Sequence, residues 1–303
     1  MPSERNFFDL KAYLSEKKAT VDRALEVYLS EPEGPTYDLI SAMRYSVFAG
    51  GKRLRPILCI AGSEAVGKAG MDVLPVACAL ELIHTYSLIH DDLPVMDDDN
   101  FRRGKATNHK IFGEAVALLA GDGLLTEAFG LMTRSELLER ISTDLILKVI
   151  DMIAHAAGYR GMVGGQVVDI QSEGKEVDFS VVEFIHTHKT GALITASVTS
   201  GAILGGGNET QLKAITLYGK KIGLAFQISD DILDVEGDSK TIGKSAGADE
   251  RKGKITYPTV VGLSRSKEIQ SELVEEAIDL LRAFDHRAEP LRRIARFIIE
   301  RKK

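Results

Sequence analysis

Cysteine is scarce in this chain of 303 residues, which contains only Cys59 and Cys78. The two residues form no CxxC pair, and two thiols cannot make a zinc site without further ligands. Each lies in an apolar stretch, which predicts small side chains buried in the core. We therefore expect a cytoplasmic protein that is free of disulfides.

Apolar targeting and membrane segments are also lacking. Residues 1–29 are rich in Glu and Lys and have no apolar signal core. No apolar run approaches the roughly 18–20 residues that are needed to span a bilayer. We therefore expect no stable insertion into a membrane.

Positive charge is not in excess. The chain has 38 Lys and Arg against 44 Asp and Glu, which gives a net charge of −6. Nucleic-acid binding requires clustered cations on a basic surface, so we expect no nucleic acid as a partner. The 44% of hydrophobic and 27% of charged residues are typical of a globular protein with a large core.

Strand-like alternation is hard to find, and only eight prolines interrupt the chain. Apolar residues instead recur at helical spacing, as in the run Leu10, Leu14, Val21 and Leu25. Gly, Pro and polar residues predict breaks near residues 31–35, 67–70, 172–178, 205–208 and 237–253. We expect an all-α fold, a bundle of about ten or more helices in a single domain over residues 1–303.

Two segments, residues 73–89 and 217–233, are apolar on nearly every side. Such helices lie inside a bundle. Each segment ends in a cluster of aspartates, which are Asp91, Asp92, Asp97, Asp98 and Asp99 in the first and Asp230, Asp231 and Asp234 in the second. Unpaired buried carboxylates are very costly, which favours a bound cation over the alternative of a solvated acidic helix end.

The spacing of the second cluster puts its carboxylates on one helical face, because Asp234 follows Asp230 by four residues. Magnesium fits better than calcium, since it uses a few carboxylates and takes further ligands from phosphates, and no calcium-loop pattern is present. In the first cluster, Pro94 should bend or end the helix. Asp97 can then fold back toward Asp91.

Basic residues accompany the acidic clusters. The segment Gly51–Pro56 carries Lys52, Arg53 and Arg55, and Arg102, Arg103 and Lys105 follow the first acidic cluster. Arginine binds phosphate oxygens in a bidentate manner and lysine supplies a point charge, although each group alone could be an exposed basic turn. Cations beside several carboxylates predict a ligand that is anionic and brings metal, such as a diphosphate.

These motifs resemble those of the trans-prenyl diphosphate synthase family. Residues 83–94 through Arg102-Arg103-Gly104 are similar to its first aspartate-rich motif, and residues 226–234 to its second. Residues 51–56, 188–190 and 253–258 match further blocks in the family's order, and the resemblance covers about residues 5–300. The four residues between Asp92 and Asp97 resemble the bacterial farnesyl and plant geranylgeranyl types. Ala106 departs from the proline of many relatives, outside the ligand positions.

The resemblance implies an isoprenoid synthase fold, with helices around a central substrate cavity, and a homodimer. It also implies about three Mg²⁺ ions, for which Mn²⁺ could substitute, bridging the allylic diphosphate. Their ligands would be Asp91, Asp92, Asp97, Asp230 and Asp234, the last directly or through water.

The resemblance assigns two diphosphate sites. Arg102, Lys189 and Lys244 would hold the allylic diphosphate, and Gly51, Lys52, Arg55, His84 and Arg103 the isopentenyl diphosphate. The catalytic residues would be Lys189, Thr190 and Gln227, of which Thr190 and Gln227 would face the carbocation. Lys254 would close over the site from the Gly-rich loop 238–253. The spacing along each helix is consistent with these roles, since Gln227 precedes Asp230 by three residues and His84 precedes Asp91 by seven, which puts each pair on one helical face.

Product length would be set at Tyr86 and Ser87, just before the first acidic cluster. In this family, a bulky aromatic there implies farnesyl diphosphate, made from dimethylallyl and geranyl diphosphates. The alternatives are a geranylgeranyl diphosphate synthase or a non-catalytic regulatory subunit, and a terpene cyclase would show only one such aspartate motif. A metal pair at His186 and His188 is disfavoured. Residues 161–166 should allow close helix packing, with Gln166 and Asp169 as candidate cavity residues.

Overall fold

The structure of the protein, a computed structural model, describes residues 8–67, 70–175, 177–236 and 255–300. Its elements are α1 (Leu10–Tyr28), α2 (Tyr37–Val47), α3 (Leu54–Val66), α4 (Leu74–Asp91), β1 (Phe101–Arg102), β2 (Lys105–Ala106), α5 (Asn108–Phe112), α6 (Glu114–Met132), α7 (Ser135–Leu138) and α8 (Thr143–Ala157). They continue with α9 (Met162–Ser172), α10 (Phe179–Ile185), the π-helix η3 (His186–Gly191), α11 (Ala192–Leu204), α12 (Glu209–Glu236), α15 (Tyr257–Val261), α16 (Leu263–Leu280) and α17 (Glu289–Glu300). Short 3-10 turns lie at Gly34–Thr36, Gly70–Val73 and His286–Ala288.

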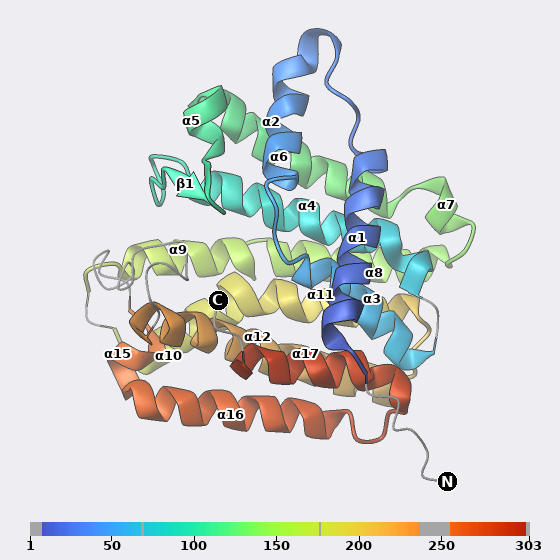
Figure 1. Ribbon diagram of the computed structural model, residues 1–303, viewed down its shortest axis with the longest axis vertical. Helices are drawn as coiled ribbons and strands as arrows, with labels where there is room; N and C mark the ends of the chain where they lie inside the picture. Colours follow the sequence, from blue (N-terminus) through green and yellow to red (C-terminus); the bar gives the residue numbers. More distant parts are fainter. Residues whose placement is uncertain (1–7, 68–69, 176, 237–254, 301–303) are drawn as a thin grey trace.

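The fold is all-helical, as the sequence predicts, apart from one small hairpin. Helix α4 packs against α6, α11 packs against α3 and α12, and α12 packs against α16. Figure 1 shows these helices stacked from α2 and α6 at one end to α16 at the other. The C-terminal ends of α4 and α12 both lie toward the left of that view, that of α4 beside β1 and that of α12 close to α15.

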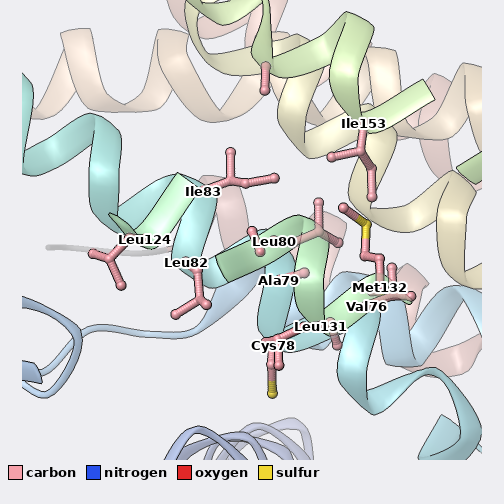
Figure 2. Packing of buried hydrophobic residues seen from close by; sticks show 14 of the residues in the cluster. Val76, Cys78, Ala79, Leu80, Leu82, Ile83, Leu124, Leu131, Met132 and Ile153 are labelled. Carbon is pink, nitrogen blue, oxygen red and sulfur yellow. The ribbon is translucent and has the colours of Figure 1, made fainter. Parts of the chain in front are cut away.

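The two segments that are apolar all round occupy the interior. Most of α4 is buried, and its side chains pack with α6 and α8 in one hydrophobic cluster, where Leu80 and Ile83 accompany Leu124 and Ile153 (Figure 2). Helix α12 contributes to a second cluster with α11, α16 and α17, in which the buried Tyr218 hydroxyl donates to the carbonyl oxygen of Leu291 at 2.7 Å. Both acidic clusters are therefore held by buried helices.

Two helical segments are longer and more apolar than we expect from the sequence, where we predict no apolar run long enough to span a bilayer. Met71–Asp91 and Glu114–Leu138 are each long and apolar enough to cross a membrane by length and composition. The expectation that no segment reaches this length is wrong, because residues such as Thr, Ser and Gly extend each helix without adding charge. In the first segment, 72% of the most apolar window is buried inside the protein, which is the property of a core helix; in the second the share is 39%.

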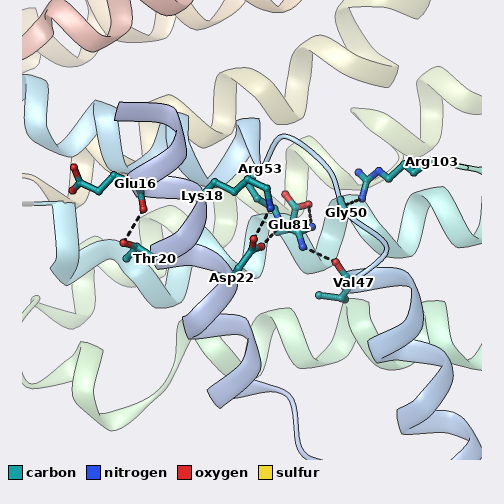
Figure 3. Close-up of polar contacts among 9 residues, drawn as sticks. All are labelled: Glu16, Lys18, Thr20, Asp22, Val47, Gly50, Arg53, Glu81 and Arg103. Atoms are coloured by element: carbon teal, nitrogen blue, oxygen red, sulfur yellow. Dashed lines mark hydrogen bonds and ion pairs between the residues drawn. The ribbon is translucent and has the colours of Figure 1, made fainter. Parts of the chain in front are cut away.

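A buried arginine anchors the turn that precedes α3. The Arg53 side chain is 1% exposed and bridges two carboxylates, Asp22 of α1 and Glu81 of α4, at 2.7 Å each (Figure 3). Its third contact is a 2.7 Å hydrogen bond to the carbonyl oxygen of Val47. Because all three partners come from different parts of the chain, Arg53 fixes the turn that carries Lys52 and Arg55.

Replacing Arg53 should strongly destabilise the protein. Arg53→Ala leaves the buried Glu81 carboxylate without its cation, which typically costs about 3–5 kcal/mol of unfolding free energy. Chemical denaturation of the variant measures this loss. Arg23→Ala is the control, since the side chain of the exposed Arg23 bonds, among the described residues, only to Thr20 of its own helix, and it should change stability by less than about 0.5 kcal/mol. Equal stabilities of the two variants would contradict the anchoring role.

Candidate active site

The first acidic cluster turns back on itself. Helix α4 ends at Asp91, and Asp92 is its C-cap. After the turn at Pro94, the backbone N–H of Asp97 donates to the carbonyl oxygen of Asp91 at 2.9 Å. The expected break and return of the chain are therefore confirmed.

A cavity of about 450 Å³ opens beside the end of α4. Its polar wall is formed by Arg55, His84, Asp91, Lys189 and Thr190. Its apolar wall continues along α4, α6 and α9 and is lined by Tyr86, Leu88, Leu118, Met162, Val163, Val167 and Ile170. The cavity is thus lined by both charged and apolar side chains, which suits a ligand with an anionic head and a hydrocarbon tail.

The environment of Asp91 opposes its negative charge. Burial, together with the neighbouring carboxylates of Asp97 and Asp92, raises the pKa of Asp91 to about 6, against the opposing effects of Lys189 and Arg102. A bound cation would stabilise the charged form of Asp91, because it would offset both the desolvation of the carboxylate and the repulsion from its acidic neighbours.

Arg102 is tied to the first acidic cluster. Its guanidinium bonds both carboxylate oxygens of the buried Asp92, with Nε at 2.7 and 2.8 Å. A two-strand hairpin delivers it, since β1 and β2 pair with Arg102 opposite Lys105. Arg103 and Gly104, at the tip, both have positive φ, as a type I′ turn requires. Asp92 and Arg102 therefore neutralise each other, although they were predicted to bind separate ligands.

A group of arginines surrounds His84. Burial lowers the pKa of His84 well below its ordinary value, and the positive charges of Arg55 and Arg103 lower it further. The Nε atom of Arg55 is buried and has no hydrogen-bond partner in the part of the chain that the structure describes, and burial lowers the pKa of Arg55 to about 10. Asp230 of α12 acts electrostatically on Arg55, so the second acidic cluster also faces this region. Concentrated positive charge of this kind attracts anions.

Gly51 makes room for Arg103. A β-carbon at Gly51 would lie 2.7 Å from the guanidinium carbon of Arg103, and its φ of +122° disfavours any other residue. The Arg103 guanidinium also bonds the carbonyl oxygen of Gly50 (Figure 3). Lys52 is exposed and lines a neighbouring pocket between α1, α12 and α17, so it is not part of the cavity wall that holds Asp91.

The π-helix η3 places Lys189 and Thr190 in the cavity. Lys189 Nζ lies 2.5 Å from Asp169 Oδ2 of α9. The close approach of α9 depends on Gly165, since a β-carbon there would be 2.3 Å from the backbone nitrogen of Lys189. The predicted packing role of the Gly-rich segment is confirmed, and so is the place of Gln166 and Asp169 along cavities.

A smaller cavity of about 90 Å³ adjoins the first, and Lys189 and Thr190 line both. Here the Thr190 hydroxyl donates to Gln227 Oε1 at 3.0 Å, and Gln227 Nε2 donates to Asp231 Oδ1 at 3.3 Å. Asp231 is buried, whereas Asp230 and Asp234 are half-buried. The three carboxylates of this cluster therefore have different environments.

Tyr86 and Ser87 line the main cavity together with Asp91. Tyr86 is only 6% exposed and meets the His90 ring edge-on at a centroid distance of 5.6 Å. The Ser87 hydroxyl bonds the carbonyl oxygen of His84 at 3.0 Å. Both predicted chain-length residues thus border the space beside Asp91.

Some predictions are not tested by the described residues. Lys244, Lys254 and the loop 238–253 lie outside the described part of the chain. Within the described part, no three His, Cys, Asp or Glu side chains are already gathered closely enough to enclose a metal ion by themselves.

Sequence reasoning missed the surroundings of Asp231, which include His186 and the backbone of Tyr257. One signal was present, because Gln227 precedes Asp231 by one helical turn. The disfavoured histidine pair is separated, since His186 stacks on Tyr257 and His188 stacks on Phe184.

Comparison with known proteins agrees with this geometry. The family described as polyprenyl synthetase matches residues 37–292. The chain is 49% identical to a farnesyl diphosphate synthase of Geobacillus stearothermophilus, covering 91% of this chain and 92% of the relative. It is 47% identical to a geranylgeranyl diphosphate synthase of Cyanophora paradoxa, covering 99% of each.

Solved structures show the same architecture. A geranylgeranyl pyrophosphate synthetase from Pyrococcus horikoshii superposes with a TM-score of 0.88 at 33% identity, covering 96% of this chain and 98% of the other. An FPP/GFPP synthase from Zymomonas mobilis gives a TM-score of 0.86 at 37% identity, covering the same shares. With a cavity lined by both charged and apolar side chains and relatives matched over nearly their whole length, the chain belongs to the polyprenyl synthetase family and is a trans-prenyltransferase.

Proposed function

We propose that this prenyltransferase condenses isopentenyl diphosphate with dimethylallyl and geranyl diphosphates to give mainly farnesyl diphosphate. The observation that carries the proposal is the single cavity that is lined both by Arg55, His84, Asp91 and Lys189 and by apolar side chains, with the ring of Tyr86 among them. Magnesium-dependent incubation with labelled isopentenyl diphosphate, followed by chromatography of the products, tests it. Absence of any condensation product would exclude the activity and favour a regulatory subunit.

Magnesium fits the acidic ends of α4 and α12. The pKa of Asp91 is raised by burial and by Asp97, so a hard cation would relieve the charge that the fold concentrates there. Asp91, Asp97 and Asp230 would hold the ions, with Asp92 and Asp234 assisting and Mn²⁺ as a substitute, and the substrate phosphates would supply further ligands. When bound, magnesium supplies positive charge against the negative charge that accumulates on the leaving diphosphate.

The chain's own groups contribute binding, orientation and exclusion of water. Lys189 is placed by Asp169 beside Asp91, where it would hold the allylic diphosphate together with Arg102. The C–O bond breaks with its electron pair leaving on the diphosphate, and the Thr190 and Gln227 oxygens would face the resulting cation. The double bond of isopentenyl diphosphate then attacks, and a proton is lost. The apolar side chains that line the cavity would offer the cation no nucleophile of their own and would limit the water beside it.

The arginine group around His84 supports an isopentenyl diphosphate site at Arg55, His84 and Arg103, with Gly51 and Lys52 on the same turn. Arg55→Ala should raise the Michaelis constant for isopentenyl diphosphate by at least about tenfold, since a charged hydrogen bond contributes roughly 1.5–3 kcal/mol. The constant for the allylic substrate should change by less. Initial rates with each substrate varied in turn measure both.

Lys105→Ala is the matched control for this prediction, because Lys105 is an exposed cation on the same hairpin as Arg103 and lies outside the main cavity. It should leave both constants near their original values. If Arg55→Ala instead weakens only the allylic substrate, the two diphosphate sites are exchanged.

The comparisons support two product lengths equally, since relatives named farnesyl and geranylgeranyl diphosphate synthases are similarly identical to this chain. The geranylgeranyl alternative is favoured by the open outer wall of the cavity, where Val163, Val167 and Ile170 are 41–47% exposed. The farnesyl product is favoured by the bulky buried ring of Tyr86, which lines the same cavity. Product sizing decides between them.

We also infer a single domain over residues 1–303, a cytoplasmic location and a homodimer. Supporting observations are the two buried free cysteines and the exposed apolar residues Leu118 and Leu119 on α6, a surface that a second copy would cover. Light scattering should give twice the mass of one chain. A monomer would exclude the dimer without affecting the proposed reaction.

A further inference from the structure

The buried carboxylate of Asp231 joins three separate elements. It is 3% exposed, and its Oδ1 accepts from Gln227 Nε2 of the same helix at 3.3 Å. Its Oδ2 accepts from the backbone N–H of Tyr257 at 2.9 Å, at the start of α15. The same oxygen lies 3.3 Å from Nε2 of His186, the first residue of the π-helix η3. One side chain therefore connects α12, α15 and η3.

This arrangement fixes the orientation of the Gln227 amide. A carboxylate accepts hydrogen bonds and offers none, so the NH₂ group of Gln227 must face Asp231. The Gln227 oxygen is then directed to the other side, where it accepts from the Thr190 hydroxyl at 3.0 Å. A rotated amide would present N–H groups to a developing cation in place of an oxygen, which would repel the charge.

The ring of His186 is held between a stacking partner, Tyr257, and the carboxylate of Asp231. It is 5% exposed, and its ring stacks on that of Tyr257 at a centroid distance of 5.1 Å and an interplanar angle of 14°. Burial lowers the pKa of His186 to about 4, so near pH 7 the ring is neutral and can present a single N–H. Nδ1 has no hydrogen-bond partner among the described residues, and Nε2 lies 3.3 Å from Asp231 Oδ2, so the tautomer that carries hydrogen on Nε2 directs its N–H toward that carboxylate.

We propose that His186 is a positioning residue, which acts through Asp231 to hold the Gln227 oxygen toward Thr190 and the reacting cation. The proposal rests on the proposed prenyl transfer. After the allylic C–O bond breaks, the cation can accept electrons from the double bond of isopentenyl diphosphate, with later loss of a proton. It can also accept a lone pair of water, which then loses a proton and yields a prenyl alcohol. The positioned oxygen favours the first outcome.

Two substitutions separate the N–H of His186 from its ring stacking. His186→Phe keeps a ring against Tyr257 but has no donor for Asp231, whereas His186→Gln keeps a donor and loses the ring. His186→Phe should lower kcat by about 10- to 100-fold, because small misplacements of catalytic groups have effects of that size. Both Michaelis constants should stay within about threefold, and the ratio of prenyl alcohol to condensation product should rise at least about threefold. His186→Gln should regain most of the lost rate.

The matched control is His188→Phe, two residues further along η3, where the ring stacks on Phe184 and bonds the Phe184 carbonyl oxygen. This variant should keep the original kcat and alcohol ratio. Circular dichroism and thermal unfolding show that each variant is folded, and His186→Leu serves in place of His186→Phe if the latter fails to fold.

A second readout is independent of catalysis. Hydrogen exchange of the Tyr257 amide reports its bond to Asp231, and exchange should accelerate in His186→Phe but not in His188→Phe. The inference is overturned if His186→Phe keeps the original kcat and alcohol ratio, if His188→Phe is equally impaired, or if His186→Gln is impaired while His186→Phe is not. An inactive wild-type protein would refute the prenyl transfer itself. In that case, unchanged exchange of the Tyr257 amide in His186→Phe would separately refute the positioning role.

Discussion

Asp91→Asn and Asp230→Asn should each lower turnover by about 10²–10³ or more, the size expected when one strong electrostatic stabiliser is removed. The two residues stand at the ends of separate buried helices and face the same region, since Asp91 lines the cavity and Asp230 acts on Arg55, which lines it too. Steady-state turnover at saturating Mg²⁺ measures the effect. Near-normal turnover in Asp230→Asn would show that the second aspartate motif takes no part in catalysis.

The fold should survive these changes. Burial and the neighbouring Asp97 already oppose the charge on Asp91, so a neutral amide relieves repulsion, and thermal unfolding should show no loss of stability for Asp91→Asn. Asp98→Asn is the control, because Asp98 is an exposed residue of the same acidic cluster and its side chain makes, among the described residues, only a 3.9 Å contact to Lys110. Its turnover should stay within about twofold of the original value.

Much of the helical framework could be predicted from the sequence. Apolar residues on every side of residues 73–89 and 217–233 predict buried helices, and α4 and α12 occupy the cores. The turn at Pro94 follows from the missing N–H and ring of proline, and Asp97 does return to Asp91. These features are local, so the periodicity of the chain and one residue type are sufficient to indicate them.

The parts that could not be predicted depend on contacts between distant segments. The β1–β2 hairpin is too short to show alternation, so its pairing of Arg102 with Asp92 was not anticipated. His186 and Tyr257 reach Asp231 from other elements, and no spacing along the chain relates them. For the same reason, only the family resemblance distinguishes the role of Arg55 from that of Arg53 in the sequence. In the structure, the buried Arg53 side chain pairs with Asp22 and Glu81 and is therefore an internal anchor.

Tyr86→Ala should shift the product from farnesyl to geranylgeranyl diphosphate or longer chains. The Tyr86 ring borders the cavity just before Asp91 on α4, and an alanine there opens the apolar space to further isoprene units. Tyr86→Phe is the control, because it keeps the ring and should keep the farnesyl product. Some stability should be lost in Tyr86→Ala, about 3–5 kcal/mol for a buried aromatic, so thermal unfolding must first show a folded variant.

The measurement is the length of the alcohols released after incubation with labelled isopentenyl diphosphate. Wild type and Tyr86→Phe should give mainly farnesol, and Tyr86→Ala should give geranylgeraniol or longer. Unchanged length in a folded Tyr86→Ala would place the limit elsewhere on the wall, where Leu118 and Val167 are the next large side chains lining the same space. A wild type that already makes the longer product would show that the ring does not close the cavity, whose outer wall is partly exposed along α9.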